Sequence, residues 1–554
     1  MSPFTNILII KSTTVKLSNL ELYIARLKTI FNRNNETNGV NDKIFNFDII
    51  GYLYRFNAIN DKDAENRINN KTIDDIDFYE VFKFIDHAKS KVGQQYLFNK
   101  LLNIECNFDF KEQELWINYL IENKENRSKI EEVLSKLNEP EAYLISNLFL
   151  DDYVKPPSYF SLLRIFTFLP IVFGILTAVS NYFFILLGLS IVINLILHYK
   201  NKMYLYLYKD SIPQLLRLLK CAKDISILDP LAKSSSVLSA SIRSIDCIKN
   251  KMFVFQLEKA GNSDLFEIFF ILFEYIKIIF LLEPFIVFDV LDKLSNKKED
   301  IKTLFNYVGK IDTYISILHT RTVSTYYCIP DFSSDCKTLE FKNVYHPLID
   351  KCVPNSLKIE GRSILLTGSN MAGKTTFIRS VAINTLLAQT INTCFANKFI
   401  LSPLRLFTAI RISDDLLSDK SYYFEEVSTI KRLVDKSVDK KASLFMLDEI
   451  FKGTNTIERI SAGKAVLSYL SKSAENIVFV STHDVELTEL LKDSYDLYHF
   501  SEVIENNQIN FDYKLKKGYL STRNAIRILE LNNYPDVIIE DARQTSQLIE
   551  RNII

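Results

Sequence analysis

The sequence lacks an excess of either charge. Its 554 residues include 67 Lys and Arg and 67 Asp and Glu. A balanced chain has no overall basic field of the kind that indicates nucleic-acid binding, although a neutral protein can still carry a local basic face. The chain is too long for one compact core, so roughly two to four domains are expected.

Paired cysteines are also lacking. The seven cysteines are dispersed, and no two of them stand in a C-x-x-C arrangement. This spacing argues against a disulfide framework or a zinc site and indicates reduced thiols in a cytosolic setting. The first residues contain a short apolar run at 7–10, but not the basic, apolar and small-residue order of a secretory signal peptide.

Charge is missing altogether between Arg164 and His198. A single helix over this stretch would be roughly 50 Å long at about 1.5 Å per residue, which exceeds a bilayer core of roughly 30 Å. Two helices joined at Ser180-Asn181 fit better. The pattern therefore predicts a transmembrane helical hairpin at about 159–199.

Basic residues flank this predicted hairpin at Lys155, Arg164, Lys200 and Lys202, whereas its tip carries no charge. The positive-inside rule then places both ends in the cytoplasm, as in a two-pass protein of the inner (cytoplasmic) membrane. The alternative is a buried helical hairpin in a large soluble core. A second apolar region, 265–290, contains several charged residues and is predicted to be a buried or membrane-surface helix that ends near Pro284.

The strongest motif is GSNMAGKTT at 368–376, which follows an apolar run and precedes a helical pattern. Backbone N–H groups can curl around a polyphosphate only where a Cβ does not obstruct the turn, and glycines stand at both ends of the loop. Lys374 would contact the β and γ phosphates, Thr375 would bind Mg²⁺, and the helix N-terminus would add its dipole. The predicted ATP-binding residues are Gly368, Ser369, Asn370, Met371, Ala372, Gly373, Lys374, Thr375 and Thr376.

Two further apolar runs end in polar residues. The run at 443–447 ends in Asp448, predicted to hold the Mg²⁺ shell, and Glu449, predicted to polarise the attacking water. The run at 477–480 is followed by His483, interpreted as a γ-phosphate sensor because ligand-contacting residues follow strands in open α/β sheets. Catalysis is therefore assigned to Lys374, Glu449 and His483. These signals predict a Mg²⁺-dependent ATPase.

Together these motifs resemble the MutS DNA mismatch repair family. The similarity extends from about residue 339 to 548 and includes SDDLLSDKSYYFEEV from Ser413, DEIFKGTNT from Asp448 and STHDVEL from Ser481. The resemblance implies a homodimer in which each protomer completes the ATP site of the other. Ser421 matches the signature position that would face the partner's nucleotide, and Asn455 lies in the loop 453–456 that would cross the dimer interface.

The fold expected from pattern and resemblance is multidomain, α and α/β. Residues 1–74 form a region of unclear fold with a short strand at 7–10 and a helix at 18–31. Residues 75–336 form a helical, MutS-like core or lever domain with the inserted hairpin. Residues 337–554, after a polar hinge at 330–337, form a P-loop ABC-type ATPase domain with a mainly parallel sheet, a β-hairpin at 495–514 and a C-terminal dimerisation segment.

Some features depart from the family pattern. No Phe-x-Glu mismatch wedge precedes Asp74, and Phe78-Tyr79-Glu80 is better interpreted as a helix start. Ser369 replaces the usual proline of the phosphate loop, and Cys352 replaces the aromatic residue expected to stack on adenine.

Two functions follow from these features. The first is a membrane-anchored, DNA-associated ATPase of mismatch-repair type. The second is a membrane-linked, nucleotide-driven conformational switch that acts on a protein or lipid partner without mismatch recognition.

Overall fold

The structure is a computed structural model, and nearly all of its described residues belong to one compact unit, Phe47–Ile554. It describes residues 45–553 apart from 61–65, 105–107, 154–155, 157–159, 207, 209, 230–235, 253–274, 336, 370–371, 412–421, 440, 474, 506–507, 520–525, 527–528 and 531–533. The strand at 7–10 and the helix at 18–31 that the sequence predicts lie outside these residues.

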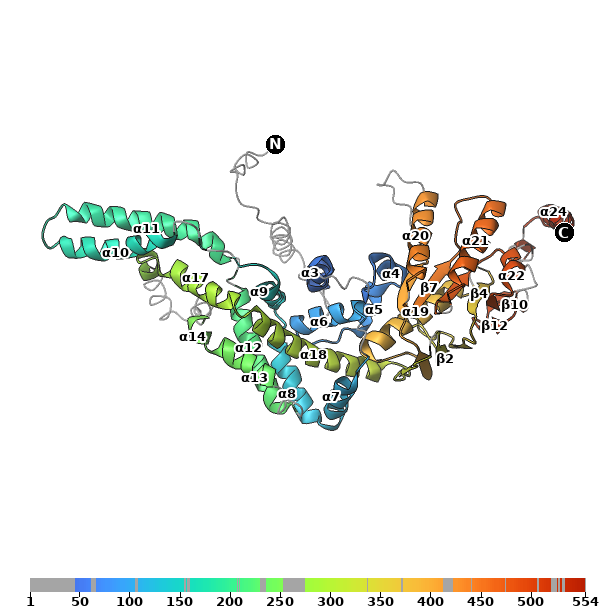
Figure 1. The fold of residues 1–554 in the computed structure, drawn as a ribbon, viewed down its shortest axis with the longest axis horizontal. Helices are drawn as coiled ribbons and strands as arrows, with labels where there is room; N and C mark the ends of the chain where they lie inside the picture. The colour runs from blue at the N-terminus through green and yellow to red at the C-terminus, as the bar shows by residue number, and fades with distance from the viewer. Residues whose placement is uncertain are drawn as a thin grey trace. The chain divides into compact units, whose positions relative to one another are not determined.

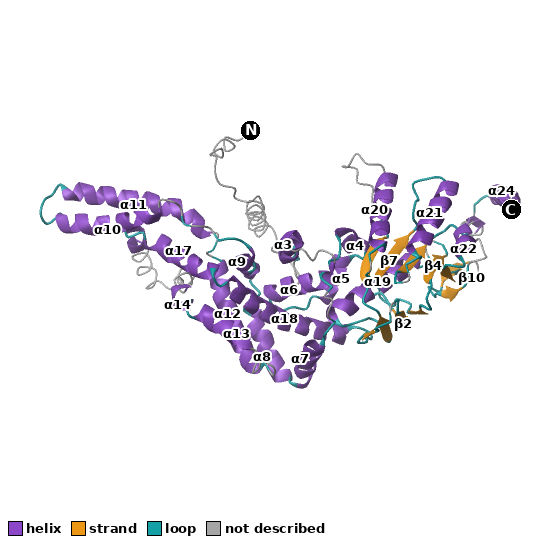
Figure 2. Ribbon diagram, in the orientation of Figure 1, coloured by secondary structure: helices purple, strands orange, loops and turns teal. Residues whose placement is uncertain are grey.

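The described chain is helical up to residue 323, and strands follow only after that point (Figure 2). The helices are α2 Phe47–Ile50, α3 Tyr52–Asn60, α4 Asn70–Asp75, α5 Phe78–Ile85, α6 Lys91–Leu102, α7 Lys111–Glu122, α8 Lys124–Ser135, the 3₁₀ helix η2 Pro140–Ile145, α9 Asn147–Leu150, α10 Phe160–Leu176, α11 Phe183–Tyr206, α12 Ser211–Leu228, α13 Ser236–Asp246, α14 Lys249–Met252, α17 Leu282–Ser295 and α18 Lys298–Val323. The helix start expected at Phe78 is confirmed, and its ring is fully buried.

Helix α18 organises the helical part, because it packs against α6, α7, α12 and α13. Its fully buried Asp312 accepts hydrogen bonds from the backbone N–H groups of Lys89 and Ser90, both at 2.8 Å, and from the Ser90 hydroxyl at 2.6 Å. These bonds hold the start of α6 against α18. Gly93 allows the close approach, since a Cβ there would lie 2.1 Å from a carboxylate oxygen of Asp312.

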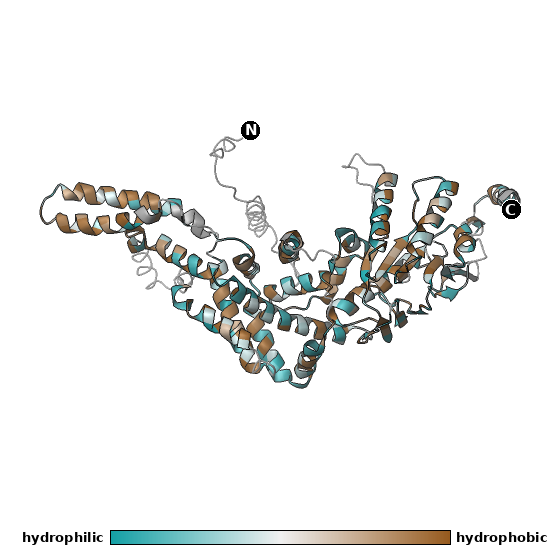
Figure 3. Cartoon of the chain, in the orientation of Figure 1, coloured by the Kyte–Doolittle hydropathy of each residue, from teal (hydrophilic) through white to brown (hydrophobic). Residues whose placement is uncertain are grey.

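Helices α10 and α11 lie side by side (Figure 1) and are joined by a turn around Ser180-Asn181, as expected. Apolar residues run along both helices (Figure 3). The large apolar side chains exposed on the two helices and on the turn between them are Ile165, Phe168, Ile171, Val172, Ile175, Val179, Tyr182, Phe184, Ile185, Leu186, Leu189, Val192, Leu195, Ile196 and Tyr199.

Of the helices that the structure describes, only α11 is long and apolar enough by itself to cross a membrane, over Phe183–Lys200. Helix α10 is shorter, with an apolar stretch at Leu163–Leu176. The two helices are therefore observed, whereas their crossing of a membrane stays a prediction.

The prediction that a helix in region 265–290 ends near Pro284 is confirmed in part, but Pro284 does not end it. Residues 253–274 lie outside the described part, and a short helical turn at 275–279 is followed by a break at Leu281, whose φ is 48°. Pro284 stands in the first turn of α17 instead of ending a helix. A proline is tolerated there because the first N–H groups of a helix have no partner within it.

The strands form two main sheets after residue 330. A six-stranded sheet has the order β12-β9-β4-β8-β7-β6, in which only β12 is antiparallel to its neighbour. A four-stranded sheet has the order β1-β5-β2-β3, and β10 and β11 form a hairpin. The strands are β1 Asp331–Phe332, β2 Leu339–Val344, β3 Asn355–Lys358, β4 Ser363–Thr367, β5 Lys398–Leu401, β6 Arg405–Ala409, β7 Ser443–Asp448, β8 Ile477–Ser481, β9 Tyr495–His499, β10 Glu502–Glu505, β11 Gln508–Phe511 and β12 Lys516–Lys517.

Helices separate most of the parallel strands, which confirms the expected α/β pattern. They are α19 Lys374–Ile391, α20 Tyr422–Ser437, α21 Thr456–Leu470, α22 Glu486–Leu491 and α24 Asp536–Ile553. The hairpin predicted at 495–514 is confirmed and extends slightly further: β10 and β11 pair around its turn, and β9 pairs antiparallel with β12 while also joining β4 in the main sheet. The hinge predicted at 330–337 contains β1, which pairs with β5.

Polar contacts connect the helical part to the sheets. Asp77, at the start of α5, forms ion pairs with Arg379 of α19 and with Arg411 after β6. The buried Asp75 accepts hydrogen bonds from the Thr408 hydroxyl at 2.7 Å and from the backbone N–H groups of residues 410 and 411 at 2.9 Å. The end of β6 is thereby fixed to helix α4.

Candidate active site

The phosphate loop follows β4, whose five residues are all buried, and it ends where α19 begins. Gly368 has a φ of 133°, and a Cβ there would lie 2.4 Å from the carbonyl oxygen of Phe500. Gly373 has a φ of 100°, and a Cβ there would lie 3.1 Å from the ring of Tyr513. Both glycines are therefore required by backbone conformation and by space. Asn370 and Met371 lie outside the described residues.

Lys374 is nearly completely buried at the N-terminus of α19. Its Nζ donates hydrogen bonds to the carbonyl oxygens of Gly368, at 2.6 Å, and Ser369, at 2.8 Å. Burial lowers the pKa of Lys374 to about 8, although the nearby carboxylates Glu449 and Asp448 raise it. The ammonium group therefore lies inside the loop, in the position from which it would contact phosphate oxygens.

Thr375 and Asp448 meet at one point of the site. The Thr375 hydroxyl donates a hydrogen bond to Asp448 Oδ2 at 2.6 Å, and the hydroxyl of Ser481 is hydrogen-bonded to Asp448 Oδ1. Strand pairing explains the second contact, because Asp448 of β7 lies opposite Ser481 of β8. A hydroxyl and a carboxylate oxygen are hard ligands that suit Mg²⁺, which is usually bound by one or two carboxylates together with substrate phosphates. The residues therefore fit a nucleotide-bound Mg²⁺.

Glu449 directly follows β7 in the left-handed backbone conformation, with a φ of 49°. Its carboxylate accepts a bond from His483 Nε2 at 2.6 Å and forms an ion pair with Lys452. Burial by itself would raise the pKa of Glu449, but the bonds from His483 and Lys452 outweigh it and lower the pKa to about 2. The side chain is therefore a carboxylate at neutral pH, as a group that polarises water must be.

Sequence reasoning missed Tyr513 and Glu502. The ring of Tyr513 lies against Gly373, and its backbone carbonyl accepts a hydrogen bond from the Asn355 amide at 3.0 Å. The Ser369 hydroxyl donates to Glu502 of β10 at 3.1 Å, a contact that the proline usual in the family could not make. The only signal in the sequence is an aromatic pair, Phe511 and Tyr513, next to the β-hairpin.

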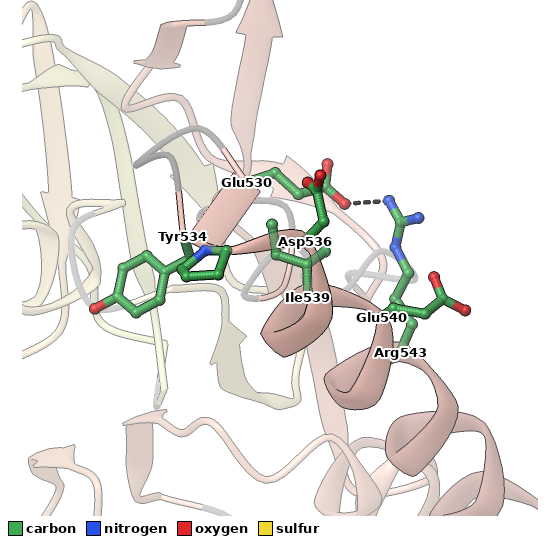
Figure 4. Close-up of a pocket in the computed structure, with 7 residues that line it drawn as sticks. Glu530, Tyr534, Asp536, Ile539, Glu540 and Arg543 are labelled. Carbon is green, nitrogen blue, oxygen red and sulfur yellow. Dashed lines mark hydrogen bonds and ion pairs between the residues drawn. The ribbon is translucent and has the colours of Figure 1, made fainter.

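A cavity lies away from the phosphate loop. Its volume is about 790 Å³, and it is formed by α24 and the residues before it, with Arg543 and Glu530 joined by an ion pair (Figure 4). The side chains drawn around it are Glu530, Tyr534, Pro535, Asp536, Ile539, Glu540 and Arg543. None of these residues belongs to the phosphate loop or to the carboxylate pair, so the nucleotide site is assigned from its chemistry and not from cavity size.

Comparison with known proteins agrees with this geometry. The family model of MutS domain V matches residues 364–550, a range that contains the phosphate loop, both carboxylates and His483. Residues 364–550 thus carry a domain of the MutS family.

Curated relatives share this region. The DNA mismatch repair protein MutS of Pseudothermotoga lettingae is 34% identical over 271 residues, which cover 47% of this chain and 33% of the relative. The same-named protein of Clostridium perfringens is 28% identical over 284 residues, covering 49% and 31%, and that of Listeria monocytogenes is 30% identical over 277 residues, covering 48% and 32%. The matched part thus spans about a third of each relative.

The MutS resemblance assigns two residues, Ser421 and Asn455, to the shared site. Ser421 lies outside the described residues, directly before α20. Asn455 caps α21, because its side chain accepts a hydrogen bond from the backbone N–H of Glu458 at 3.0 Å. Their roles across a dimer stay predictions.

The loop before Asn455 is nevertheless held by α20. The buried carboxylate of Glu426 accepts bonds from the backbone N–H groups of Lys452, at 3.1 Å, and Gly453, at 3.4 Å. A Cβ at Gly453 would lie 2.9 Å from the side chain of Tyr423. Helix α20 and the start of the loop 453–456 are therefore in direct contact.

Proposed function

We propose that this chain binds and hydrolyses ATP with Mg²⁺ as a dimer, and that it does so while anchored to the cytoplasmic membrane. One observation supports the proposal that the chain hydrolyses ATP. Lys374, the Thr375–Asp448 pair and the Glu449–His483 pair converge at the carboxyl ends of β4, β7 and β8, which are neighbours in the sheet. Ligands bind at this edge of open α/β sheets.

The residues then have distinct roles. Lys374 would exchange its bonds to the loop carbonyls for bonds to phosphate oxygens, and the N-terminus of α19 would add its dipole. Mg²⁺, held through Thr375 and Asp448, would neutralise charge on the phosphates. Glu449 would orient and polarise the attacking water, while His483 holds the carboxylate in place and reaches toward the γ-phosphate.

Tyr513 is proposed to supply the stacking surface for adenine. Cys352 takes the place of the aromatic residue expected there, whereas the Tyr513 ring lies beside Gly373 at the end of the phosphate loop. The Asn355 amide fixes the backbone here, since it donates to the Tyr513 carbonyl and accepts from the backbone N–H of Leu515 at 2.8 Å. The ring is therefore held close to where a bound nucleotide would begin.

The membrane part of the proposal rests on the exposed surface of α10 and α11. Only 17% of the residues between Phe183 and Lys200 are buried, so α11 does not have the surroundings of a soluble core helix. Transfer of the half-exposed apolar side chains to lipid is worth on the order of 15 kcal/mol in total, at roughly 1 kcal/mol each. This favours the two-pass hairpin, with Lys200 and Arg164 near its cytoplasmic ends.

Two effectors are proposed for the ATPase. DNA is favoured by the relatives, which are named DNA mismatch repair proteins. A protein or lipid partner is favoured by the hairpin, by the lack of a Phe-x-Glu triplet before Asp74 and by the balanced charge. In the second case the nucleotide cycle would move the helical part at the membrane without mismatch recognition.

The discriminating experiment measures the ATPase rate of full-length protein in lipid vesicles, with and without homoduplex, mismatched and branched DNA at two salt concentrations. Stimulation that falls steeply with salt would indicate DNA, because phosphate contacts release counterions. Basal ATPase with neither stimulation nor binding would eliminate DNA as the effector. Absence of ATPase in every condition would refute the hydrolytic proposal.

Membrane anchoring is tested separately by alkaline carbonate extraction of cell membranes. Ile185→Lys with Leu189→Lys places two charges on the exposed face of α11 and should shift the protein to the soluble or aggregated fraction. Ile227→Lys is the matched control, because Ile227 is equally apolar and 82% exposed but lies on α12. Full extraction of the unmodified protein by carbonate would refute the anchor.

A further inference from the structure

Asn194, on α11, is a fully buried polar residue in the apolar hairpin. Its amide nitrogen donates to the carbonyl oxygen of Phe166 on α10 at 3.0 Å and to that of Ile279, in the helical turn before α17, at 2.6 Å. One side chain thus bonds two backbone segments that are distant from it in sequence. Because both neighbours are acceptors, the NH₂ group must face them.

The Phe166 carbonyl lacks its regular helical partner. In an α-helix the carbonyl of residue 166 would accept from the N–H of residue 170, and that residue is Pro170, which has no N–H. Pro170 is inside α10 and not in its first turn, so the missing bond cannot be attributed to a helix end. The Asn194 amide supplies the donor that the proline removes.

The Ile279 carbonyl also lacks a regular helical partner, but for a different reason. It lies in the last turn before the break at Leu281, whose left-handed backbone stops the helical bonding pattern. The last carbonyls of a helix have no partner within it. The second N–H of Asn194 therefore satisfies a carbonyl that the helix break exposes.

In water such carbonyls would be solvated, but in lipid they must be satisfied by protein. We infer that Asn194 is the positioning residue of a membrane-embedded unit made of three segments, α10, α11 and the turn 275–279, with the lipid bilayer as its partner. This rests on the proposed membrane anchoring and extends it, since the third segment has too few described residues to be recognised as a membrane element by itself.

The position of Asn194 in α11 fits this role. Ser190 and His198, four residues before and after it, are also buried, so the buried polar residues follow one face of α11 while apolar residues cover the exposed face. Polar residues on the inward face of membrane helices connect neighbouring helices. The exposed face, with Ile185, Leu189 and Ile196, is left for lipid.

The test uses full-length protein in lipid vesicles that carries Phe166→Cys and Ile279→Cys, at the two residues whose carbonyls accept from Asn194. The native cysteines are replaced, and a short bifunctional maleimide is added. The linked peptides are quantified by mass spectrometry. Loss of two interhelical hydrogen bonds in Asn194→Leu should lower the ratio of linked to unlinked protein about eightfold. Asn181→Leu, the same change at the exposed tip of the hairpin, is the control and should leave the ratio unchanged.

A second variant separates hydrogen bonding from packing. Pro170→Ala restores an N–H that can satisfy the Phe166 carbonyl within α10, so it should recover part of the linking lost in Asn194→Leu. The role of Asn194 would be overturned if Asn194→Leu lowered the ratio of linked to unlinked protein equally with and without Pro170→Ala. It would also be overturned if Asn194→Leu did not lower this ratio. Carbonate extraction of the same samples reports on the anchor. A soluble protein that still cross-links would refute the bilayer location while leaving the three-segment unit intact.

Discussion

The buried Asp312 predicts an unusual pH dependence of the helical part. Its carboxyl is completely inside the junction of α6 and α18, and burial raises its pKa from 3.8 to about 6, despite the bonds from Ser90 and Lys89. An acid whose pKa is higher in the folded state binds its proton more tightly there. The contribution of Asp312 to stability is therefore fully present below pH 3.8 and is lost as the pH rises to about 6.

The size of this effect follows from the shift. A rise from 3.8 to about 6 corresponds to about 3 kcal/mol of unfolding free energy, at about 1.4 kcal/mol per pH unit. Other carboxyls titrate in the same range, so the relevant quantity is the difference between the protein and Asp312→Asn, whose side chain does not titrate. Relative to Asp312→Asn, the unmodified protein should lose about 3 kcal/mol between pH 4 and pH 7.

The assay uses the single tryptophan of the chain. Trp116 lies on α7, is buried and belongs to the helical part that packs on α18, so its fluorescence reports unfolding of this region in urea. Urea curves of both proteins in detergent at several pH values give the difference directly. Parallel pH dependences in the two proteins would refute the argument, because they would mean that Asp312 has the same pKa folded and unfolded.

Other predictions concern the active site. Glu449→Gln should keep nucleotide binding but lower kcat about 10²- to 10⁴-fold, and unchanged turnover would remove it from catalysis. Tyr513→Ala should raise the KM for ATP about tenfold through lost stacking, with Tyr513→Phe as the neutral control. Ser421→Ala should reduce the part of ATP hydrolysis that depends on protein concentration, while single protomers still bind nucleotide. A hydrolysis rate per chain that does not depend on protein concentration would contradict the shared site. Gly368→Ala should abolish binding measured by calorimetry, because its Cβ would lie 2.4 Å from the Phe500 carbonyl.

The sequence predicted the parts of the site that are local. Asp448 ends β7, Glu449 directly follows it, and Lys374 and Thr375 begin the helix after the loop that follows β4. Their place at one edge of the sheet follows from the parallel order of these strands. The contacts of Glu449 with His483 also follow from neighbouring strands β7 and β8.

The parts that depend on distant pairing could not be predicted. Tyr513 lies beside Gly373 although 140 residues separate them, and no local pattern determines this approach. The role of Pro284 was predicted wrongly. A proline that ends one helix and a proline in the first turn of the next helix have the same flanking residues, so the sequence does not distinguish them. The β-hairpin was predicted, but the second pairing of β9, with β4 of the main sheet, depends on a strand more than 100 residues away and was not.

The strand order of the six-stranded sheet has a consequence for synthesis of the protein. Strand β4 is in the middle of its sheet, and both neighbours, β8 and β9, are made more than 100 residues later. From the end of α11 to the end of β9 about 290 residues must be added, which takes roughly 15–60 s at ribosomal rates. In the proposed membrane-anchored protein, the apolar hairpin therefore leaves the ribosome and can enter the bilayer well before the nucleotide site can form. Each chain would then reach the membrane before it could become active.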